Sequence, residues 1–336
     1  MNLIRDKMRR QLLALAWGSL LAGAVALPGG VAAQGNTQIS IGSTASGSSA
    51  YTYYASVAAI LNRDLAGKVQ ATVIETGASV ENVRRLARKQ LTMGLVTSDI
   101  AYRTYAGEGT EPNKNLRVLW TYFIAPQFYV VRQDSAVSSV QGLTGKKFNP
   151  GFRGSATEST TQTIFEELQI KPEYFRATLD DSIAAVKDNR IVGYAKGGSP
   201  ASLDSTTMEI ASLTPIRVLS FTDEQIAKVR ARHSYITWLT LKPGDVSGLG
   251  TEVKTWAPMT HVATSSEALS EQLGYEIVKA VFNSQKEQAQ TTPSIAQIDF
   301  TRTLLLSSVP LHAGTVKYLR EIGVGIPNQL IPPEAR

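Results

Sequence analysis

Strand-like hydrophobic runs alternate along the chain with segments whose apolar residues recur at helical spacing. Runs rich in β-branched residues, typical of strands, lie at 38–44, 69–76 and 93–98. Apolar residues at helical spacing lie at 50–66, 79–91 and 99–107. A repeated order of strand and helix predicts an α/β unit with a largely parallel sheet.

The alternation restarts after an aromatic-rich run over 116–133, which predicts a long strand crossing between two domains. Later helices are expected at 155–170, 182–190, 202–212, 222–233, 266–290 and 312–323. Later strands are expected at 191–197, 216–221, 234–242 and 260–266. Thr222 with Gln225 three residues on is a capping-box signature, so one of these helices has a defined start.

Two α/β units, a crossing near 120–132 and a return near 255–265 predict two lobes that exchange segments. We expect lobe one to hold residues 37–123 and 260–324, lobe two to hold 124–259, and 325–336 to form a tail. The chain of 336 residues is long enough for two domains of about 150 residues each.

The first 33 residues read as an export signal. A basic start is followed by an apolar run from about Leu12 to Leu27, a Pro-Gly-Gly break and the small residues Val31-Ala32-Ala33. The apolar run is too short for a bilayer span, which needs about 20 residues. We therefore predict cleavage near Ala33/Gln34 and a periplasmic protein that is not embedded in a membrane.

Charge and cysteine content exclude several classes of protein. Without the signal, 30 Lys and Arg stand against 27 Asp and Glu, a balance too mild for a nucleic-acid-binding surface. The chain has no cysteine, which excludes disulfides, thiol nucleophiles and thiolate metal sites. Its three histidines, His233, His261 and His312, lack metal-ligand spacing. We expect no catalytic residues, no metal and no cofactor.

Three loops at 42–54, 76–86 and 149–164 share one pattern, in which a strand end is followed by Gly with small hydroxyl residues and then a helix. The unpaired N–H groups at a helix start attract anions, and such loops meet at the carboxyl ends of parallel strands. Ordinary helix capping explains any one loop equally well. The first and third loops together favour an anionic ligand, with Ser46, Ser48, Ser49, Ser155 and Thr157 as hydroxyl donors.

Single residues near these loops have alternative roles. The guanidinium of Arg153 matches a carboxylate in two-point contact, although it could also face solvent or pair with Glu158. Tyr51 could line a pocket. Asp99 could cap its helix or hold a ligand ammonium group. Lys196 could face the cleft or be solvated.

The chain resembles the TAXI solute receptors (TRAP-associated extracytoplasmic immunogenic proteins) from about residue 38 to 324. The resemblance rests on the Ser/Gly-rich loop with its tyrosines at 46–54, ETGASVENVRRLARKQLTMGLVTSD (75–99), LTGKKFNPGFRGSATES (143–159) and VPLHAGTVKYLREIG (309–323). The loop after Pro150-Gly151 departs from the common family pattern by an added Arg, which still suggests a carboxylate ligand.

This resemblance implies a two-lobed periplasmic-binding-protein (Venus-flytrap) fold, each lobe a mostly parallel sheet flanked by helices. It implies capture of a small carboxylate and docking to TRAP transporter membrane subunits, by a protein that we expect to be a monomer. The residues expected to hold the ligand are Ser48, Ser49 and Tyr51 from lobe one, Arg153, Gly154, Ser155 and Thr157 from lobe two, and Thr97, Asp99 and Gln127 from the cleft floor. The alternatives are a sensing subunit that passes its closed form to a sensor kinase, and a periplasmic hydrolase.

Overall fold

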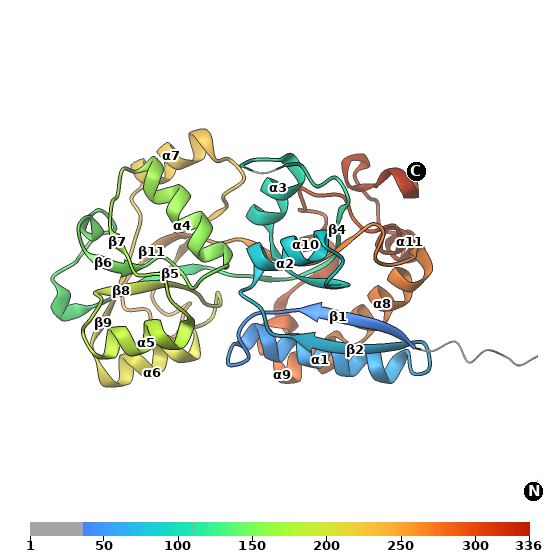
Figure 1. The fold of residues 1–336 in the computed structure, drawn as a ribbon, viewed down its shortest axis with the longest axis horizontal. Helices are drawn as coiled ribbons and strands as arrows, with labels where there is room; N and C mark the ends of the chain where they lie inside the picture. Colours follow the sequence, from blue (N-terminus) through green and yellow to red (C-terminus); the bar gives the residue numbers. More distant parts are fainter. Residues whose placement is uncertain (1–35, 110) are drawn as a thin grey trace, which may run out of the picture. The chain divides into compact units, whose positions relative to one another are not determined.

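Two five-stranded sheets with helices packed on them organise the protein (Figure 1). The structure, a computed structural model, describes residues 36–109 and 111–336. Residues from Asn36 to Arg336 form one compact unit. The predicted export signal lies outside the described residues.

The first sheet has the strand order β2-β1-β3-β12-β4, and the second has β7-β6-β8-β5-β9. The strands of the first are β1 (Thr37–Gly42), β2 (Val69–Ile74), β3 (Met93–Thr97), β4 (Leu116–Ile124) and β12 (Met259–Ser265). Those of the second are β5 (Gln127–Arg132), β6 (Lys147–Asn149), β7 (Glu173–Tyr174), β8 (Gly193–Gly197) and β9 (Ile216–Leu219). In each sheet a single strand, β12 or β5, runs antiparallel to its neighbours. The prediction of two mostly parallel sheets is therefore confirmed.

The helices divide between the sheets, and we call each sheet with its helices a lobe. With the first sheet, as lobe one, go α1 (Ser49–Asp64), α2 (Ser79–Ala87), α3 (Ser98–Ala106), α8 (Glu271–Asn283), α9 (Gln285–Thr291), α10 (Phe300–Leu304) and α11 (Ala313–Glu321). With the second, as lobe two, go α4 (Ala156–Glu167), α5 (Leu179–Lys187), α6 (Ser205–Leu213) and α7 (Asp223–Arg232). Short 3₁₀ turns lie at Gln133–Ser135, Gln141–Leu143, Pro293–Gln297, Asn328–Leu330 and Pro333–Ala335.

The chain crosses between the sheets twice. The long strand expected over 116–133 is two strands, since β4 ends in the first sheet and β5 starts in the second. Pro126 between them has no N–H for a sheet ladder, so the chain leaves one sheet and joins the other. The return passes from β11 (Val253–Trp256) to β12, and the N–H of Ala125 donates to the carbonyl of Pro258 at 2.9 Å. The exact lobe boundaries stay a prediction.

Other differences from the expected elements are local. The helix expected at 79–91 ends at Ala87, because Lys89 takes a left-handed φ of 57° and the N–H of Gln90 bonds to the carbonyl of Arg85. The helix expected at 266–290 is interrupted at Ser284, which separates α8 from α9. The strand β11 was not expected; it pairs with β10 (Trp238–Leu241) in a separate antiparallel ribbon. The capping box at Thr222 and Gln225 is confirmed.

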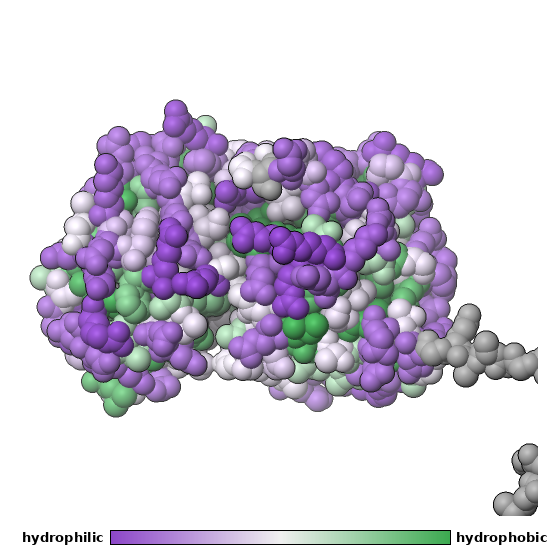
Figure 2. Space-filling view, viewed as in Figure 1, coloured by the Kyte–Doolittle hydropathy of each residue, from purple (hydrophilic) through white to green (hydrophobic). Residues whose placement is uncertain are grey.

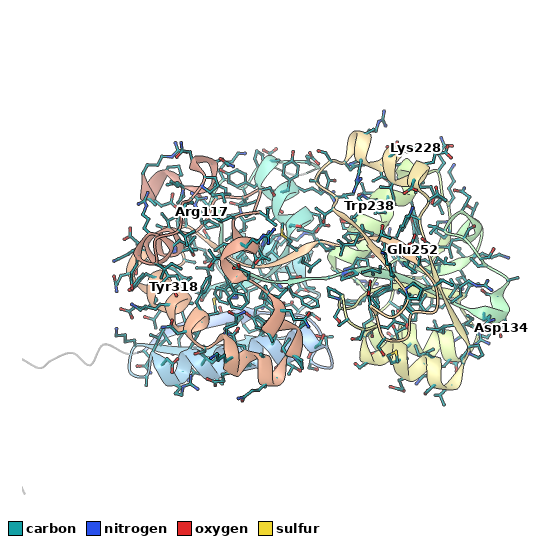
Figure 3. All side chains as sticks on the ribbon, turned by 180° about the vertical axis from the view of Figure 1, so that it is seen from behind. Arg117, Asp134, Lys228, Trp238, Glu252 and Tyr318 are labelled. Atoms are coloured by element: carbon teal, nitrogen blue, oxygen red, sulfur yellow. The ribbon has the colours of Figure 1, made fainter. Side chains whose placement is uncertain are left out.

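An ion pair between a buried arginine and a partly exposed glutamate fixes the last residues of the chain. Arg117 on β4 is buried, and its Nε and Nη2 donate to the two carboxylate oxygens of Glu334 at 2.7 and 2.9 Å (Figure 3 labels Arg117). This pairing holds the pKa of Glu334 below its usual range. The segment expected to be a tail is therefore packed on lobe one.

Burial of His261 makes stability depend on pH. His261 on β12 is fully buried, with Nδ1 2.8 Å from the hydroxyl of Thr121, and burial lowers its pKa to about 4. The unfolded chain titrates near pH 6.5, so it binds the proton first as the pH falls. We expect the contribution of neutral His261 to the free energy of unfolding, about 3 kcal/mol, to be fully present above pH ~6.5. It should be lost as the pH falls towards ~4.

Urea unfolding at a series of pH values measures this effect, with His261→Gln as the comparison. The variant should show a shallower pH dependence. Asp99 acts in the opposite direction, because burial raises the pKa of its carboxyl. Its protonated form stabilises the folded state at low pH, and this stabilisation is lost as the pH rises through the raised pKa. An equally steep dependence in the variant would show that His261 is not the titrating group.

Candidate functional site

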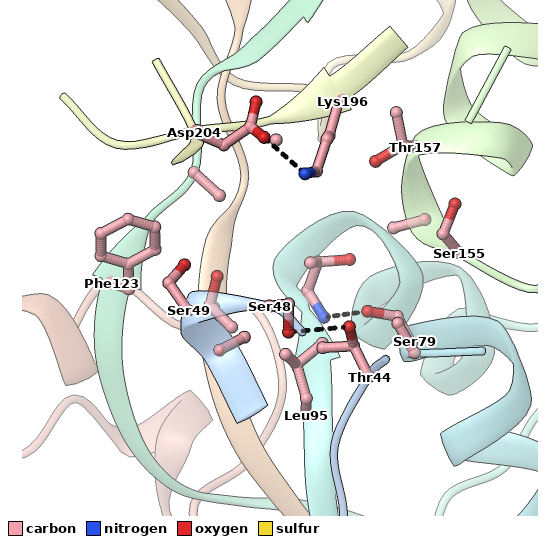
Figure 4. A pocket seen from close by; sticks show the side chains of 18 of the residues that line it. Thr44, Ser48, Ser49, Ser79, Leu95, Phe123, Ser155, Thr157, Lys196 and Asp204 are labelled. Carbon is pink, nitrogen blue, oxygen red and sulfur yellow. Dashed lines mark hydrogen bonds and ion pairs between the residues drawn. The ribbon is translucent and has the colours of Figure 1, made fainter. Parts of the chain in front are cut away.

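The starts of five helices meet at one cavity of about 140 Å³ between the two sheets (Figure 4). The residue that precedes each helix lines this cavity: Ser48 before α1, Ala78 before α2, Thr97 before α3, Ser155 before α4 and Asp204 before α6. Each helix start carries unpaired N–H groups and a partial positive charge. Their convergence gives the cavity a positive potential suited to an anion.

Side-chain caps fix three of these helix starts. The hydroxyl of Ser48 accepts the N–H of Tyr51 at 3.1 Å, and that of Ser155 accepts the N–H of Glu158 at 3.1 Å. The carboxylate of Asp204 accepts the N–H of Thr207. Each of these caps satisfies only one N–H group, so other donors of the first turns are left without a helical partner.

Helix α2 is capped by the other lobe. Ala78 has a φ of 76° and makes no side-chain cap. Instead, the carbonyl of Gly154 accepts the N–H groups of Val80 at 3.1 Å and Glu81 at 3.3 Å. These two bonds join lobe one to the loop before α4, and we call this contact the seam.

A buried ion pair supplies the formal charges of the cavity. Lys196 on β8 donates from Nζ to the carboxylate of Asp204, and their side chains are only 9% and 11% exposed. Lys196 therefore faces the cleft rather than bulk solvent. Because the charges of Lys196 and Asp204 cancel, the electrostatic potential of the cavity is set by the helix starts. Each of the two side chains can still turn a polar atom towards a ligand.

The rest of the lining combines hydroxyl, amide and apolar groups. Thr157 donates to the side-chain carbonyl of Gln127 at 2.7 Å, which joins α4 to the start of the crossing strand β5. Thr97 is buried, and its hydroxyl has no hydrogen-bond partner among the described residues. Leu95, Tyr122, Phe123, Ala125 and Phe152 provide apolar walls. Such a cavity can enclose a small solute with a polar end and a short apolar body.

The structure brings seven of the twelve predicted site residues to this cavity: Ser48, Ser49, Thr97, Gln127, Ser155, Thr157 and Lys196. Ser46, Tyr51, Asp99, Arg153 and Gly154 do not line it. Asp99 is buried beside α4 and accepts a hydrogen bond from Thr160, so it joins the lobes rather than capping α3. Arg153 lies on the other side of the seam, in a separate depression.

Sequence reasoning missed several lining residues. Thr44, Ser79, Asp204, Ser205 and Thr260 line the cavity, as do the apolar residues named above. Thr44 and Ser79 belong to two of the loops already singled out, and Asp204-Ser205 is an ordinary helix-start signal that could have been used. Thr260 follows the return crossing and carries no local signal of a ligand site.

A metal-binding cluster and a membrane-spanning helix are both absent from the described residues. Among residues 36–109 and 111–336, no group of three or more His, Asp or Glu side chains is placed to hold a metal ion. In the same part of the chain, no helix is both long and apolar enough to cross a bilayer.

Two mostly parallel sheets, two crossings and a cavity between the sheets are the features of the two-lobed periplasmic-binding-protein fold. The chain belongs to the NMT1-like family, whose model matches residues 41–323.

Three solved structures illustrate the likeness in fold. The aliphatic sulphonate binding protein SsuA of Escherichia coli is 14% identical, with 78% of this chain and 82% of that one covered and a TM-score of 0.42. The alkanesulfonate-binding protein SsuA of Xanthomonas axonopodis pv. citri, bound to MOPS, is 15% identical over 90% and 98%, with a TM-score of 0.47. The GluR0 ligand-binding core of Nostoc punctiforme, in complex with L-glutamate, is 11% identical over 78% and 98%, with a TM-score of 0.45.

Proposed function

We propose that this protein is a periplasmic receptor that captures a small carboxylate-bearing solute and delivers it to a membrane transporter. The observation that carries the proposal is the convergence of five helix starts and the Lys196–Asp204 pair on one cavity. A carboxylate placed there would accept hydrogen bonds from backbone N–H groups, hydroxyls and the ammonium of Lys196. Such charge-assisted bonds contribute about 1.5–3 kcal/mol each.

The size and composition of the cavity restrict the ligand. A volume of about 140 Å³ is close to that of a cavity known to hold benzene, about 150 Å³, so the ligand has few non-hydrogen atoms. Asp204 beside Lys196 could hold a ligand ammonium group, which makes amino acids candidates alongside organic acids. Arg153, which the sequence suggested as the carboxylate-binding residue, is replaced in this role by Lys196.

Delivery to a sodium-driven tripartite transporter is supported by the sequence segments that resemble TAXI receptors. In this mechanism the ligand binds between the lobes and prefers the arrangement in which they touch, which shifts a hinge equilibrium at the two crossings. The seam at Gly154 is a contact that such closure would form. The membrane subunits would then read the closed form.

A ligand screen tests the capture step. The protein is purified without denaturation, any retained small molecule is identified by mass spectrometry, and melting temperatures are measured with carboxylic acids, amino acids, sugars and neutral amides. A true ligand at 100 times its Kd should add ~2.7 kcal/mol and raise the melting temperature by roughly 5–10 °C. Arg153→Ala should respond to a monocarboxylate as the wild type does, because Arg153 lies outside the cavity.

The outcomes separate the parts of the proposal. Stabilisation by neutral solutes alone would keep the receptor but reject the anion site, and conversion of the ligand to a product would reject the receptor in favour of an enzyme. Delivery is tested in cells by sodium-dependent uptake of the identified ligand. Uptake that persists after deletion of this gene would show that the protein is not required for transport of the ligand.

A further inference from the structure

A second depression lies on the far side of the seam and is lined by arginines of both lobes. Its volume is about 450 Å³, and its lining includes Arg84 of α2 together with Arg153 and Arg176 of lobe two. Figure 2 shows strongly hydrophilic side chains gathered over α2 and α4 on the face in view. This arginine depression is separated from the central cavity by the hydrogen bonds from Val80 and Glu81 to Gly154.

Most of the positive charge in the depression is not neutralised. Within the described residues, neither Arg84 nor Arg153 has a carboxylate within 4.0 Å. The one acidic residue of the lining, Glu158, accepts the N–H of Gly154 at 2.9 Å and lies 3.8 Å from Arg176. Three guanidinium groups against one carboxylate leave an excess of two positive charges in the lining.

The adjoining surface contributes a fourth arginine. Arg103 of α3 donates to the hydroxyl of Ser159 of α4 at 3.0 Å, and it shares a neighbouring depression with Arg84. That neighbouring depression also holds Glu108 and Glu111. The excess positive charge is therefore greatest at Arg84, Arg153 and Arg176, where planar guanidinium groups can each bind an oxyanion by two points.

We propose that the arginine depression is a second anion site, which takes a multivalent oxyanion such as phosphate, sulfate or a tricarboxylate. Contact between the lobes brings Arg84 towards Arg153 and Arg176, and these like charges repel one another. An oxyanion between them replaces the repulsion with attraction, so it binds the closed arrangement better than an open one. The oxyanion and the captured solute would both favour the closed arrangement, and this link between them rests on the proposed function. The anion site itself does not.

Melting temperatures test the site directly. Sodium sulfate, sodium phosphate and sodium citrate are compared with sodium chloride at equal ionic strength. At ten times its Kd, a bound anion should raise the melting temperature of the wild type by ~3 °C beyond the chloride control. The double variant R84Q/R153Q should lose this rise, and R84K/R153K should keep part of it because the charge remains while the planar fork is lost.

Two comparison variants make the result specific. R88Q/R230Q removes one exposed arginine from each lobe outside the depression, so it should keep the full rise. The variant K196M/D204N alters the central cavity and should keep it too. The proposal is overturned if R84Q/R153Q keeps the rise, if R88Q/R230Q loses as much, if K196M/D204N alone loses it, or if the wild type shows no rise beyond chloride.

Discussion

Replacing Lys196 by Met is expected to lower the free energy of unfolding by ~3–5 kcal/mol, because the buried carboxylate of Asp204 then has no opposite charge beside it. The same change should weaken carboxylate binding by about 10- to 100-fold, since one charge-assisted hydrogen bond to the ligand is lost. Chemical denaturation gives the first quantity. Isothermal titration with the carboxylate identified by the ligand screen gives the second.

The double variant K196M/D204N separates the two effects. Asn caps a helix as well as Asp does, so α6 keeps its start while the buried charge is removed. Stability should return close to that of the wild type, whereas carboxylate binding should stay weak. If the double variant binds as tightly as the wild type, Lys196 has no role in ligand recognition and the charge pair is purely structural.

The part of the site that could be predicted from sequence follows from the fold class. In a mostly parallel sheet the loops after the strands meet at one edge, so hydroxyl-rich loops far apart in the chain come together. For this reason the sequence pattern alone predicts that Ser48, Ser155 and Thr157 share one cavity. The crossing strand that carries Gln127 was predicted from its aromatic and β-branched residues, and the role of Gln127 came from the family resemblance.

The direction of individual side chains could not be predicted in this way. Gly154 takes a left-handed φ of 81°, and this turn helps to place Arg153 outside the cavity while Ser155 lines it. The partner of Lys196 depends on how α6 packs beside β8, which no local pattern reports. The sequence therefore predicts an anion-binding site, while tertiary packing decides which positively charged side chain lines it.

The helices and strands also divide into those that local sequence predicts and those that depend on tertiary packing. The capping box at Thr222 is a local signal that marks where α7 starts. Pro126 is also a local signal, but it was not used when one long strand was predicted over 116–133. The strand β11 pairs with β10 across a connection of eleven residues, 242–252, and depends on a partner that its own sequence does not specify. The start of α7 was therefore predictable from a local signal, and the pairing of β11 with β10 was not.

Adding a methyl group at Gly77 is expected to weaken ligand binding by about 10- to 100-fold without touching the ligand, at a cost of ~1–3 kcal/mol to the closed arrangement. A Cβ at Gly77 would lie 2.7 Å from the carbonyl of Arg153 across the seam. Its other close neighbour is the carboxylate of Glu81 at 2.9 Å, the end of a flexible side chain that can move. The carbonyl of Arg153 belongs to the backbone and yields less readily than a side chain, so we expect the lobes to separate.

The conformational effect of Gly77→Ala can be measured with spin labels, because the chain contains no native cysteine. Labels at the exposed positions Gln90 of lobe one and Lys171 of lobe two should report a longer distance in the variant. Gly250→Ala is the matched control, since a Cβ there meets no atom within 4 Å. Unchanged affinity and unchanged label distance in Gly77→Ala would mean that the seam adapts without opening, and ligand capture would then not depend on the capping of α2 by Gly154.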